Sequence, residues 1–283
     1  MNRFENRPGS RPLLPGVLLC CLLIAGCAGR LPPMTDLSAT ESGAVAAAFA
    51  EVQAQARRCG PCFDAEVEAQ VSFSNLLGSK SGRLVGYLQA MAPASLKFVA
   101  VNPLGQPLFV FVTDGQRFRS LIVLEAREYE GPVQSALFRK YAPPGFEPAE
   151  AFAWLSGWPG ASAGIVAVRR AVAEEGYWLE LHRGSDSAQS YILFEPNSGE
   201  VRRHILQDGQ GRLTMDVSYD GQAATGAGSA AGCRLPARIT VAALPSNGNL
   251  ILDLKDVLLP ETPFGADVFA VESPAGFQKI VVE

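Results

Sequence analysis

LTMDVSYD, the stretch from Leu213 to Asp220, alternates strictly between apolar and polar residues. Successive side chains of a β-strand point to opposite faces of the sheet, so this period of two predicts a strand with one apolar and one polar face. The same period recurs from Tyr177 to His182 and from Arg238 to Val241. Each of these strands has to bury its apolar face, either in a core or along a cavity.

Turn signals follow one another at intervals of roughly ten residues from about Glu66 onward, as in a β-barrel or a β-sandwich. Glycine beside Asp, Asn or Ser tolerates the positive φ that tight hairpins need. We therefore expect a mainly β chain of antiparallel strands. The predicted turns are Ser81-Gly82, Asp114-Gly115, Glu175-Gly176, Asn197-Ser198-Gly199, Asp208-Gly209 and Asn247-Gly248.

Three stretches have a helical period instead. Ala44 to Arg58 brings Val45 and Phe49 to one face, which predicts an N-terminal helix that packs on the sheet. Val133 to Tyr141 and Pro148 to Ser156 predict two short helices inserted between strands.

The second of these short helices has Pro148 in its first turn and Gly157 after its end, which are favoured positions for both residues. The large apolar side chains of the two helices, among them Phe138 of the first, must be buried, and the apolar face of the sheet is the available partner. We therefore predict a helical lid over the sheet. The predicted lid residues are Phe152, Trp154, Leu155 and Trp158.

The N-terminus has the parts of a bacterial lipoprotein export signal, namely a basic start, an apolar stretch and small residues before the cleavage site. Three arginines precede the apolar run Leu13 to Ala25, and Leu23-Ile24-Ala25-Gly26-Cys27 closes it. A membrane span needs roughly 18 to 20 apolar residues, more than this run contains. We predict a leader over residues 1–26 that is cleaved before Cys27, rather than a transmembrane helix.

Leu23 to Cys27 resembles a lipobox, which implies that Cys27 is the acylated first residue of the mature chain. Ala28 stands where an Asp would imply retention at the inner membrane, so the resemblance implies an outer-membrane anchor that faces the periplasm. Residues 27–43 are rich in Pro, Ser, Thr and Gly and predict a flexible tether, while 44–283 form one domain. No stretch after Cys27 is apolar for long enough to span a bilayer.

Three further cysteines, Cys59, Cys62 and Cys233, remain after Cys27. In an oxidising compartment this odd number predicts one disulfide and one free or intermolecular thiol, with the pairing left open. Cys59-Gly60-Pro61-Cys62 has the spacing of a thioredoxin-type redox pair, but that pair acts at the start of a helix and here it follows one. A structural role is therefore favoured over redox catalysis.

The sequence contains no convincing set of catalytic residues. Gly160 to Gly164 matches a hydrolase nucleophile pattern, but that pattern needs a strand before the serine and a helix after it, the reverse of the order here. His182 and His204 are expected in strands facing water, and two histidines are too few for a zinc site. We expect no enzyme activity, no metal and no cofactor.

The charges also exclude one class of partner. A formal net charge of −4, with no strong basic patch, argues against nucleic acid. The paired charges Glu174-Glu175, Arg169-Arg170 and Arg202-Arg203 are expected to be solvated near strand ends.

Phe98 to Gly105, FVAVNPLG, resembles the strand-and-loop signature of the LolB family of outer-membrane lipoprotein receptors. Trp154 to Gly160, WLSGWPG, is similar to that family's helix, which ends in Trp, a gap of two, Gly, a gap of one, and Pro-Gly. A weaker match is the late strand from Leu250 to Val257 with its LDLKD run. In order and spacing the resemblance covers roughly residues 44–258.

The resemblance implies an unclosed antiparallel β-barrel, a half-barrel, around an apolar cavity covered by helices. It also implies a monomer that takes the acyl chains of lipoproteins from a periplasmic carrier and inserts them into the outer membrane. The implied membrane-insertion loop is Asn102, Pro103, Leu104 and Gly105, with Leu104 protruding, although Pro and Gly mark turns in any protein. The tail Pro260 to Glu283 lies outside the pattern and could add a strand through Phe269 and Val271.

Two other functions stay open. A structural or assembly lipoprotein of the same fold would have a cavity filled by its own side chains. A thiol oxidoreductase would use Cys59 and Cys62.

Overall fold

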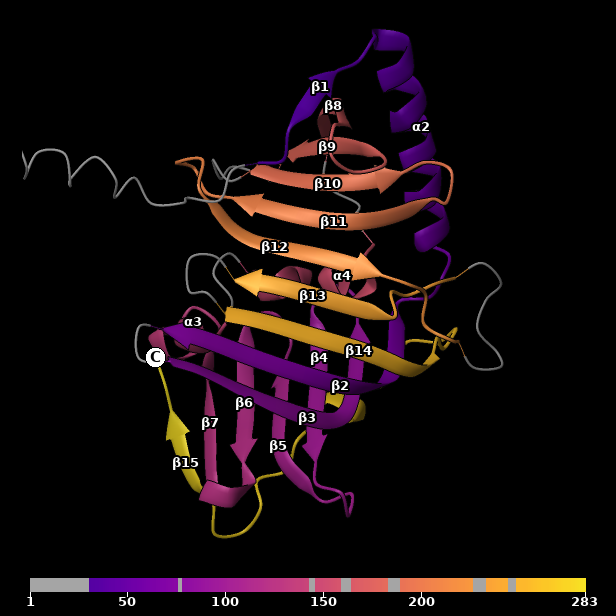
Figure 1. The fold of residues 1–283 in the computed structure, drawn as a ribbon. Helices are drawn as coiled ribbons and strands as arrows, with labels where there is room; N and C mark the ends of the chain where they lie inside the picture. The colour runs from indigo at the N-terminus through magenta and orange to yellow at the C-terminus, as the bar shows by residue number, and fades with distance from the viewer. Residues whose placement is uncertain are drawn as a thin grey trace, which may run out of the picture.

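A computed structural model describes residues 31–75, 78–142, 146–158, 164–182, 189–225, 233–243 and 248–283 (Figure 1). The predicted leader, the acylation site Cys27 and the start of the tether lie outside these residues. So do most of the serine pattern 160–164 and most of 222–232, a stretch of mainly Ala, Gly, Ser and Thr whose composition predicts a mobile loop between strands.

The described residues form one sheet of fifteen strands with helices beside it. Along the chain the elements are β1 (Met34–Asp36), α2 (Ala39–Ala56), β2 (Cys62–Asn75), β3 (Gly78–Met91), β4 (Ser95–Val101), β5 (Pro107–Thr113), β6 (Arg117–Ile122), η1 (Val123–Glu125), β7 (Arg127–Pro132), α3 (Ala136–Tyr141), η2 (Pro148–Glu150), α4 (Ala151–Ser156), β8 (Ile165–Ala171), β9 (Tyr177–His182), β10 (Gln189–Glu195), β11 (Glu200–Gln207), β12 (Leu213–Asp220), β13 (Arg238–Ala243), β14 (Gly248–Leu258), η3 (Ala266–Phe269) and β15 (Gln278–Val281).

Two antiparallel meanders join to make this sheet. β8 to β14 form one, β2 to β7 form the other, and β14 pairs with β2 between them. β1 lies at one end of the sheet and β15 at the other, so the sheet does not close on itself. This confirms the predicted mainly β, unclosed half-barrel.

The sheet bends sharply where β3 meets β4, and β4 to β7 run nearly across the direction of β2 and β3 (Figure 1). Gly86 of β3 lies at this crossing. A Cβ built on Gly86 would lie 2.0 Å from the carbonyl oxygen of Val99, so only glycine lets β4 approach this closely. The bend gives the inner face of the sheet its concave shape.

The alternation of Leu213 to Asp220 is confirmed in β12, where Leu213, Met215, Val217 and Tyr219 are buried and the residues between them are more exposed. β9 differs, because Trp178, between the predicted apolar positions, is also buried. Its indole packs on the outer face with Tyr191 and Leu193, near Leu31 and Met34. The N-terminal chain therefore covers part of the face that we expected to be wet.

The predicted tether 27–43 is too long. Met34–Asp36 pairs with β8 as β1, and α2 begins at Ala39 rather than Ala44. Ser38 caps this helix, its Oγ accepting from the amide of Glu41 at 3.3 Å. The missed signal is the Ser38-x-x-Glu41 spacing of a capping box. The predicted apolar face is correct, since Val45 and Phe49 are buried against β9 and β10.

One predicted turn is wrong. Ser81 and Gly82 lie inside β3, paired with Ser72 and Val71 of β2, because the ladder between these two long strands extends to the pair Asn75 and Gly78, before Ser81 in the chain. The turns at Asp114-Gly115, Glu175-Gly176, Asn197-Ser198-Gly199 and Asp208-Gly209 do join neighbouring strands. Asn247 lies outside the described residues.

The C-terminal tail adds a strand, but not through Phe269 and Val271. Ala266–Phe269 forms the short helix η3, and the strand is β15, which pairs with β7 in parallel. Lys97 of β4 donates to the carbonyl of Val268 at 2.7 Å, and Arg119 of β6 donates to the carbonyl of Val271. The tail thus crosses the outer side of the second meander before it covers the edge strand β7, which shields the unpaired backbone of that edge.

Candidate functional site: a lidded apolar cavity

A cavity of about 860 Å³ lies between the concave face of the sheet and the inserted helices. Pockets that bind small molecules are roughly 300–1000 Å³ and mostly apolar. Side chains from β2 to β7 and β12 to β14 form its wall, and side chains of α3 and α4, with Ala142 and Phe146, form its cover. Six phenylalanines line it: Phe98, Phe109, Phe111, Phe118, Phe138 and Phe146.

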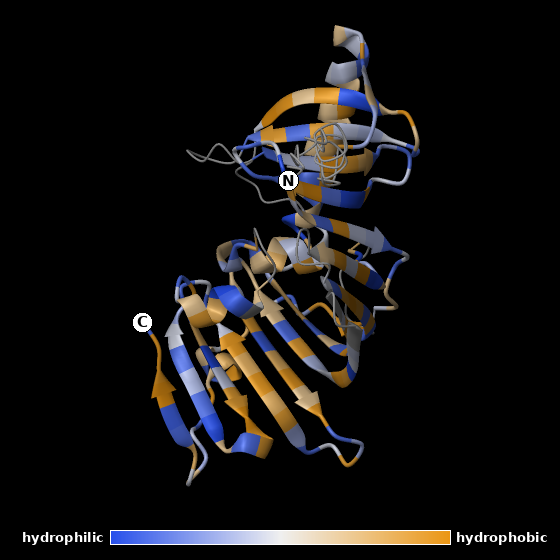
Figure 2. Ribbon diagram, turned by 60° about the vertical axis from the view of Figure 1, so that its left-hand side comes forward, coloured by the Kyte–Doolittle hydropathy of each residue, from blue (hydrophilic) through white to orange (hydrophobic). Residues whose placement is uncertain are grey.

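The pleat of β4 to β6 supplies most of these rings, because alternate residues of a strand face the same side. Phe98 and Phe109 lie 6.4 Å apart between ring centroids, and Phe111 and Phe118 are also 6.4 Å apart. The residues that alternate with these rings face the other side of the sheet. Among them, Lys97 and Arg119 donate hydrogen bonds to the C-terminal tail. Figure 2 shows the hydrophobic segments recurring along these strands in the lower half of the molecule.

Two of the predicted lid residues line the cavity and two do not. Trp154 and Leu155 of α4 face it. Phe152 packs behind the lid on Phe63, with ring centroids 5.8 Å apart, and Trp158 lies 6.1 Å from Phe152. Phe152 lies about half a turn from Trp154 around α4, on the opposite side of the helix, and Trp158 follows the end of the helix at Ser156.

Phe138 of α3, which was predicted to be buried with the helical insertion, also lines the cavity. Leu137 of α3 and Phe146 line it too and were not predicted at residue level. Ser135 caps α3, its Oγ accepting from the amide of Phe138 at 3.4 Å. On the wall, Phe109 and Phe111 escaped notice because LFVFV in β5 is apolar at every position and shows no alternation.

Hydrogen bonding and stacking hold α4 to the sheet. The Tyr219 hydroxyl donates to the carbonyl of Trp154 at 3.0 Å. Burial raises the pKa of Tyr219 well above its ordinary value, so this hydroxyl keeps its proton. The ring of His204 stacks on Trp154 with centroids 4.0 Å apart, and its Nε2 contacts the Ser190 hydroxyl. The expectation that His204 faces water is therefore wrong, because the lid covers it.

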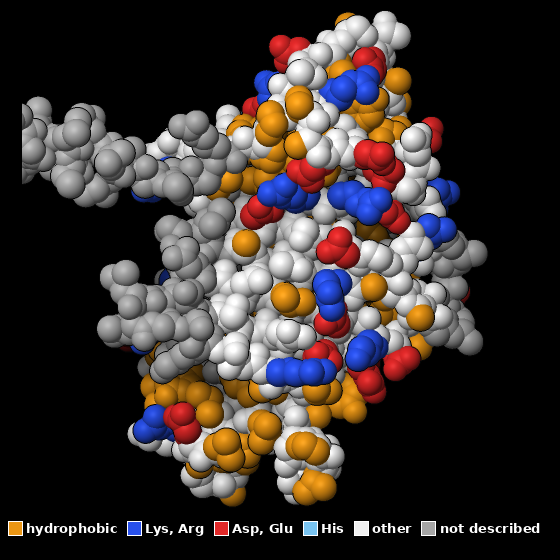
Figure 3. All heavy atoms as spheres, in the orientation of Figure 1, with side chains coloured by type: hydrophobic (Ala, Val, Ile, Leu, Met, Phe, Trp, Pro, Cys, Tyr) orange, Lys and Arg blue, Asp and Glu red, His pale blue; other side chains and the backbone are white. Residues whose placement is uncertain are grey.

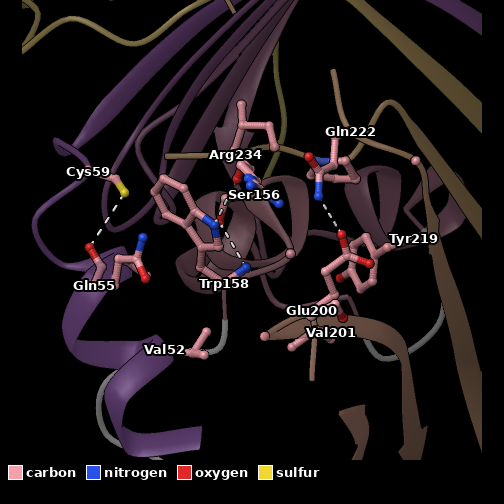
Figure 4. A pocket seen from close by; sticks show the side chains of 17 residues that line it. Val52, Gln55, Cys59, Ser156, Trp158, Glu200, Val201, Tyr219, Gln222 and Arg234 are labelled. Carbon is pink, nitrogen blue, oxygen red and sulfur yellow. Dashed lines mark hydrogen bonds between the residues drawn. The ribbon is translucent and has the colours of Figure 1, made fainter. Parts of the chain in front are cut away.

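A smaller pocket of about 270 Å³ lies at the C-terminal end of α4 (Figure 4). There the Trp158 indole donates to the carbonyl of Arg234 at 3.1 Å. Gly157 ends α4 with a φ of 67°, in the left-handed region that favours glycine at this position. The residue before Arg234 is Cys233, which forms a disulfide with Cys59 at a Cα–Cα distance of 5.3 Å.

This disulfide decides between the cysteine alternatives. Cys59 is bonded to Cys233 and not to Cys62, so the C-x-x-C spacing does not form a redox pair. Cys62 is a free buried thiol that lies 3.3 Å from the carbonyl oxygen of Thr262. Burial raises the pKa of Cys62, which disfavours the reactive thiolate.

Polar groups line the cavity at one place. Ser120, Glu125 and Arg127 lie where β6 passes through η1 into β7. Arg127 and Glu125 form an ion pair at 2.9 Å, and about half of each side chain is exposed. This polar rim marks where the cavity meets solvent.

The predicted insertion loop is the turn between β4 and β5. The Asn102 side-chain oxygen accepts from the amides of Leu104 at 2.9 Å and Gln106 at 3.0 Å. Gly105 has a φ of 79°, and its amide donates to the Asn102 carbonyl at 2.9 Å. The turn is therefore held by its own hydrogen bonds, and the Leu104 side chain is 83% exposed.

The paired charges are not simply solvated. Arg203 binds Asp216 at 2.6 Å and Glu174 at 2.8 Å, and Arg169 binds Glu180 at 3.0 Å. The pairs of Arg203 with Asp216 and of Arg169 with Glu180 join neighbouring strands, and Glu174 reaches Arg203 from the turn between β8 and β9. Among the described residues, no cluster of His, Cys, Asp or Glu could hold a metal ion. No helix in the described ranges is both long and apolar enough to cross a bilayer.

No protein-family model and no curated protein sequence matches this chain. Solved structures do. A LolA superfamily protein from Nitrosomonas europaea is 12% identical, with a TM-score of 0.52 over 79% of this chain and 97% of that one. A DUF1329 family protein from Desulfovibrio piger is 9% identical, with a TM-score of 0.54 over 80% of this chain and 99% of that one. The chain has a LolA-like fold, and the narrower resemblance to LolB stays a prediction.

Proposed function

We propose that this protein binds the acyl chains of lipoproteins in the lidded cavity and has no enzymatic activity. The cavity of about 860 Å³ carries this proposal, because six phenylalanines line it and the chain's own side chains leave it open. The LolA-like fold supports it, since one solved protein of that fold belongs to the LolA superfamily.

The physical need is clear for any protein that receives lipoproteins in an aqueous compartment. Each methylene exposed to water costs about 0.8 kcal/mol, so a chain of about fifteen methylenes costs roughly 12 kcal/mol. A concave apolar wall under helices removes this surface from water. The half-exposed rings of β4 and β5 are suited to this, because hydrocarbon would complete their packing.

The narrower function follows from the sequence. We propose that the chain takes lipoproteins from a periplasmic carrier and inserts them into the outer membrane, to which acylated Cys27 anchors it. The lipobox-like end of the leader and Ala28 support the anchor and its location. The exposed Leu104 on its rigid turn supports the insertion step.

The open cavity disfavours the structural-lipoprotein alternative, which requires that side chains fill it. The Cys59–Cys233 disulfide disfavours the oxidoreductase alternative.

Leu252 and Ile251 provide a matched test of the cavity. They are neighbours in β14, and Leu252 lines the cavity while Ile251 pairs with Gln70 and Thr240. Leu252→Glu places a carboxylate in the apolar wall and should weaken binding of a triacylated cysteine peptide at least about tenfold. Ile251→Glu should bind it as the unchanged protein does.

The measurement is native mass spectrometry of the chain from Ala28, which contains every described element, with the lipopeptide in detergent-free buffer. Thermal unfolding of both variants checks that they fold. If the unchanged protein formed no complex, or if both variants bound equally well, the cavity would not be the acyl-binding site.

A further inference from the structure

Leu104 and Leu124 are the most exposed large hydrophobic residues of the described chain, at 83% and 85%. The next such residue, Val281, is 62% exposed. Single exposed leucines are ordinary on protein surfaces. These two are unusual because of where they lie.

Both leucines lie at the same end of the sheet. Leu104 is in the turn between β4 and β5, and Leu124 is in η1, between β6 and β7. Val101 at the end of β4 pairs with Pro107 at the start of β5, and Ile122 at the end of β6 pairs with Phe109 near the start of β5. The β4–β5 turn and η1 therefore lie at the same end of neighbouring strands. In the space-filling view, hydrophobic side chains gather at this lower end of the molecule (Figure 3).

The backbone of η1 is held as firmly as that of the β4–β5 turn. The amide of Ala126 donates to the carbonyl of Val123 at 3.1 Å, which closes the short helix. The carbonyl of Ala126 accepts from the amide of Gln278 at 2.8 Å, so β15 fixes η1 from outside. Leu124 is thus presented to solvent on an anchored turn.

The position of Leu124 also relates it to the cavity. Ile122 and Glu125, on either side of it along the chain, line the cavity, and Arg127 does so just beyond. Leu124 therefore protrudes beside the polar rim where the cavity meets solvent. A surface that Leu124 entered would lie next to this opening.

We propose that Leu124 and Leu104 form a two-leucine tip that enters the apolar boundary of a lipid bilayer and brings the cavity rim against it. This inference rests on the proposed function and extends it by naming Leu124 as a second membrane contact. The residue acts by positioning the cavity, and no chemical step is assigned to it.

A bilayer suits this tip better than a protein surface does. Stable protein interfaces bury about 800 Å² on each partner, and two leucines on narrow turns offer far less. A bilayer accepts single apolar side chains at the boundary between headgroups and acyl chains. Asn102 to Gln106 carry no charge, and Glu125 and Arg127 of the second turn neutralise each other.

The predicted lipid anchor does not itself bring the tip to a bilayer. Leu31 begins the described chain near β1, at the end of the sheet opposite the tip (Figure 1). Four residues beyond Cys27 span at most about 14 Å. The vesicle test therefore uses a chain without the anchor, so that binding reports on the tip alone.

Vesicle flotation with the chain from Ala28 tests the tip without the lipid anchor. Leu124→Glu and Leu104→Glu should each lower the fraction bound to phosphatidylcholine vesicles roughly tenfold, because each withdraws one leucine from the bilayer. The double variant should fall to background. Leu258→Glu is the matched control, since Leu258 is an exposed leucine of β14, away from the tip.

The lipopeptide complex, measured on the same variants, separates this inference from the proposed function. Leu124→Glu should bind lipopeptide as the unchanged protein does, because its side chain points away from the cavity wall. If Leu124→Glu bound vesicles as well as the unchanged protein does, the proposal that Leu124 enters a bilayer would be contradicted. An equal loss in Leu258→Glu would also overturn it.

Discussion

At the scale of single residues, the most telling feature is Leu104, a leucine that the fold leaves in water. The Asn102 side chain fixes the turn beneath it through two amide hydrogen bonds. Burying a leucine side chain is worth roughly 1.5–3 kcal/mol, so an apolar partner that covered Leu104 would gain about this much. Under the proposed function that partner is the bilayer that receives the cargo.

Leu104→Glu should separate capture from delivery. The side chain makes no part of the cavity wall, so lipopeptide binding and stability should change little. Transfer of a bound lipoprotein to vesicles should fall at least about tenfold, because a carboxylate resists entry into the apolar region. Fluorescence dequenching of labelled cargo measures the transfer, and equal rates for variant and unchanged protein would contradict the insertion role.

At the scale of elements, the lid and the disulfide are linked. α4 ends at Gly157, and the Trp158 indole that follows is held by the carbonyl of Arg234. The neighbouring Cys233 is tied to Cys59, just after α2. One covalent bond therefore joins the end of the N-terminal helix to the segment that holds the lid.

Replacing both bonded cysteines, Cys59→Ser with Cys233→Ser, should destabilise the protein by about 4 to 5 kcal/mol, because the bond closes a long loop. The sequence separation is 174 residues. Chemical denaturation measures the free energy of unfolding. Cys62→Ser leaves the disulfide intact and is the control. An equal loss in that control would show that the disulfide has no special role.

At the scale of the whole molecule, the C-terminal tail ties the second meander together. Arg119 of β6 binds the tail at Val271 and Ser273, and it also binds Glu128 of β7 at 2.6 Å. Burial alone would raise the pKa of Glu128, but the hydrogen bond from Arg119 and the nearby positive charges hold it below its ordinary 4.5. The ionised carboxylate therefore favours the folded chain.

The sign of this shift predicts acid sensitivity. The contribution of Glu128 is complete above pH 4.5 and disappears as the pH falls through the lower folded pKa. Glu128→Gln should lower the free energy of unfolding at pH 7, and the gap from the unchanged protein should shrink in acid. Denaturation at pH 7 and below pH 4 measures the gap, with Glu175→Gln on an exposed turn as control. A gap that stayed constant would refute this account.

The sheet as a whole explains why several local predictions missed. Gly82 looked like a turn residue, but the long ladder between β2 and β3 passes through it. Trp178 lies between the apolar positions of β9, on the face that alternation predicts to be polar, yet the N-terminal chain covers it. His204 was expected in water, yet α4 stacks Trp154 on it. In each case a segment remote in sequence changed the environment of the residue.

The sequence by itself determined the mainly β, antiparallel character of the chain and the places of its three predicted helical stretches, because alternation, helical spacing and turn chemistry are local properties of a chain. It also identified Leu104, Trp154 and Leu155, since these lie in short motifs. Only the tertiary structure decided that Cys59 pairs with Cys233, that Phe109 and Phe111 line the cavity, and that Leu124 lies beside Leu104. These outcomes depend on how strands far apart in sequence come together, and no local pattern encodes the bend at Gly86 that brings the cavity wall beneath its lid.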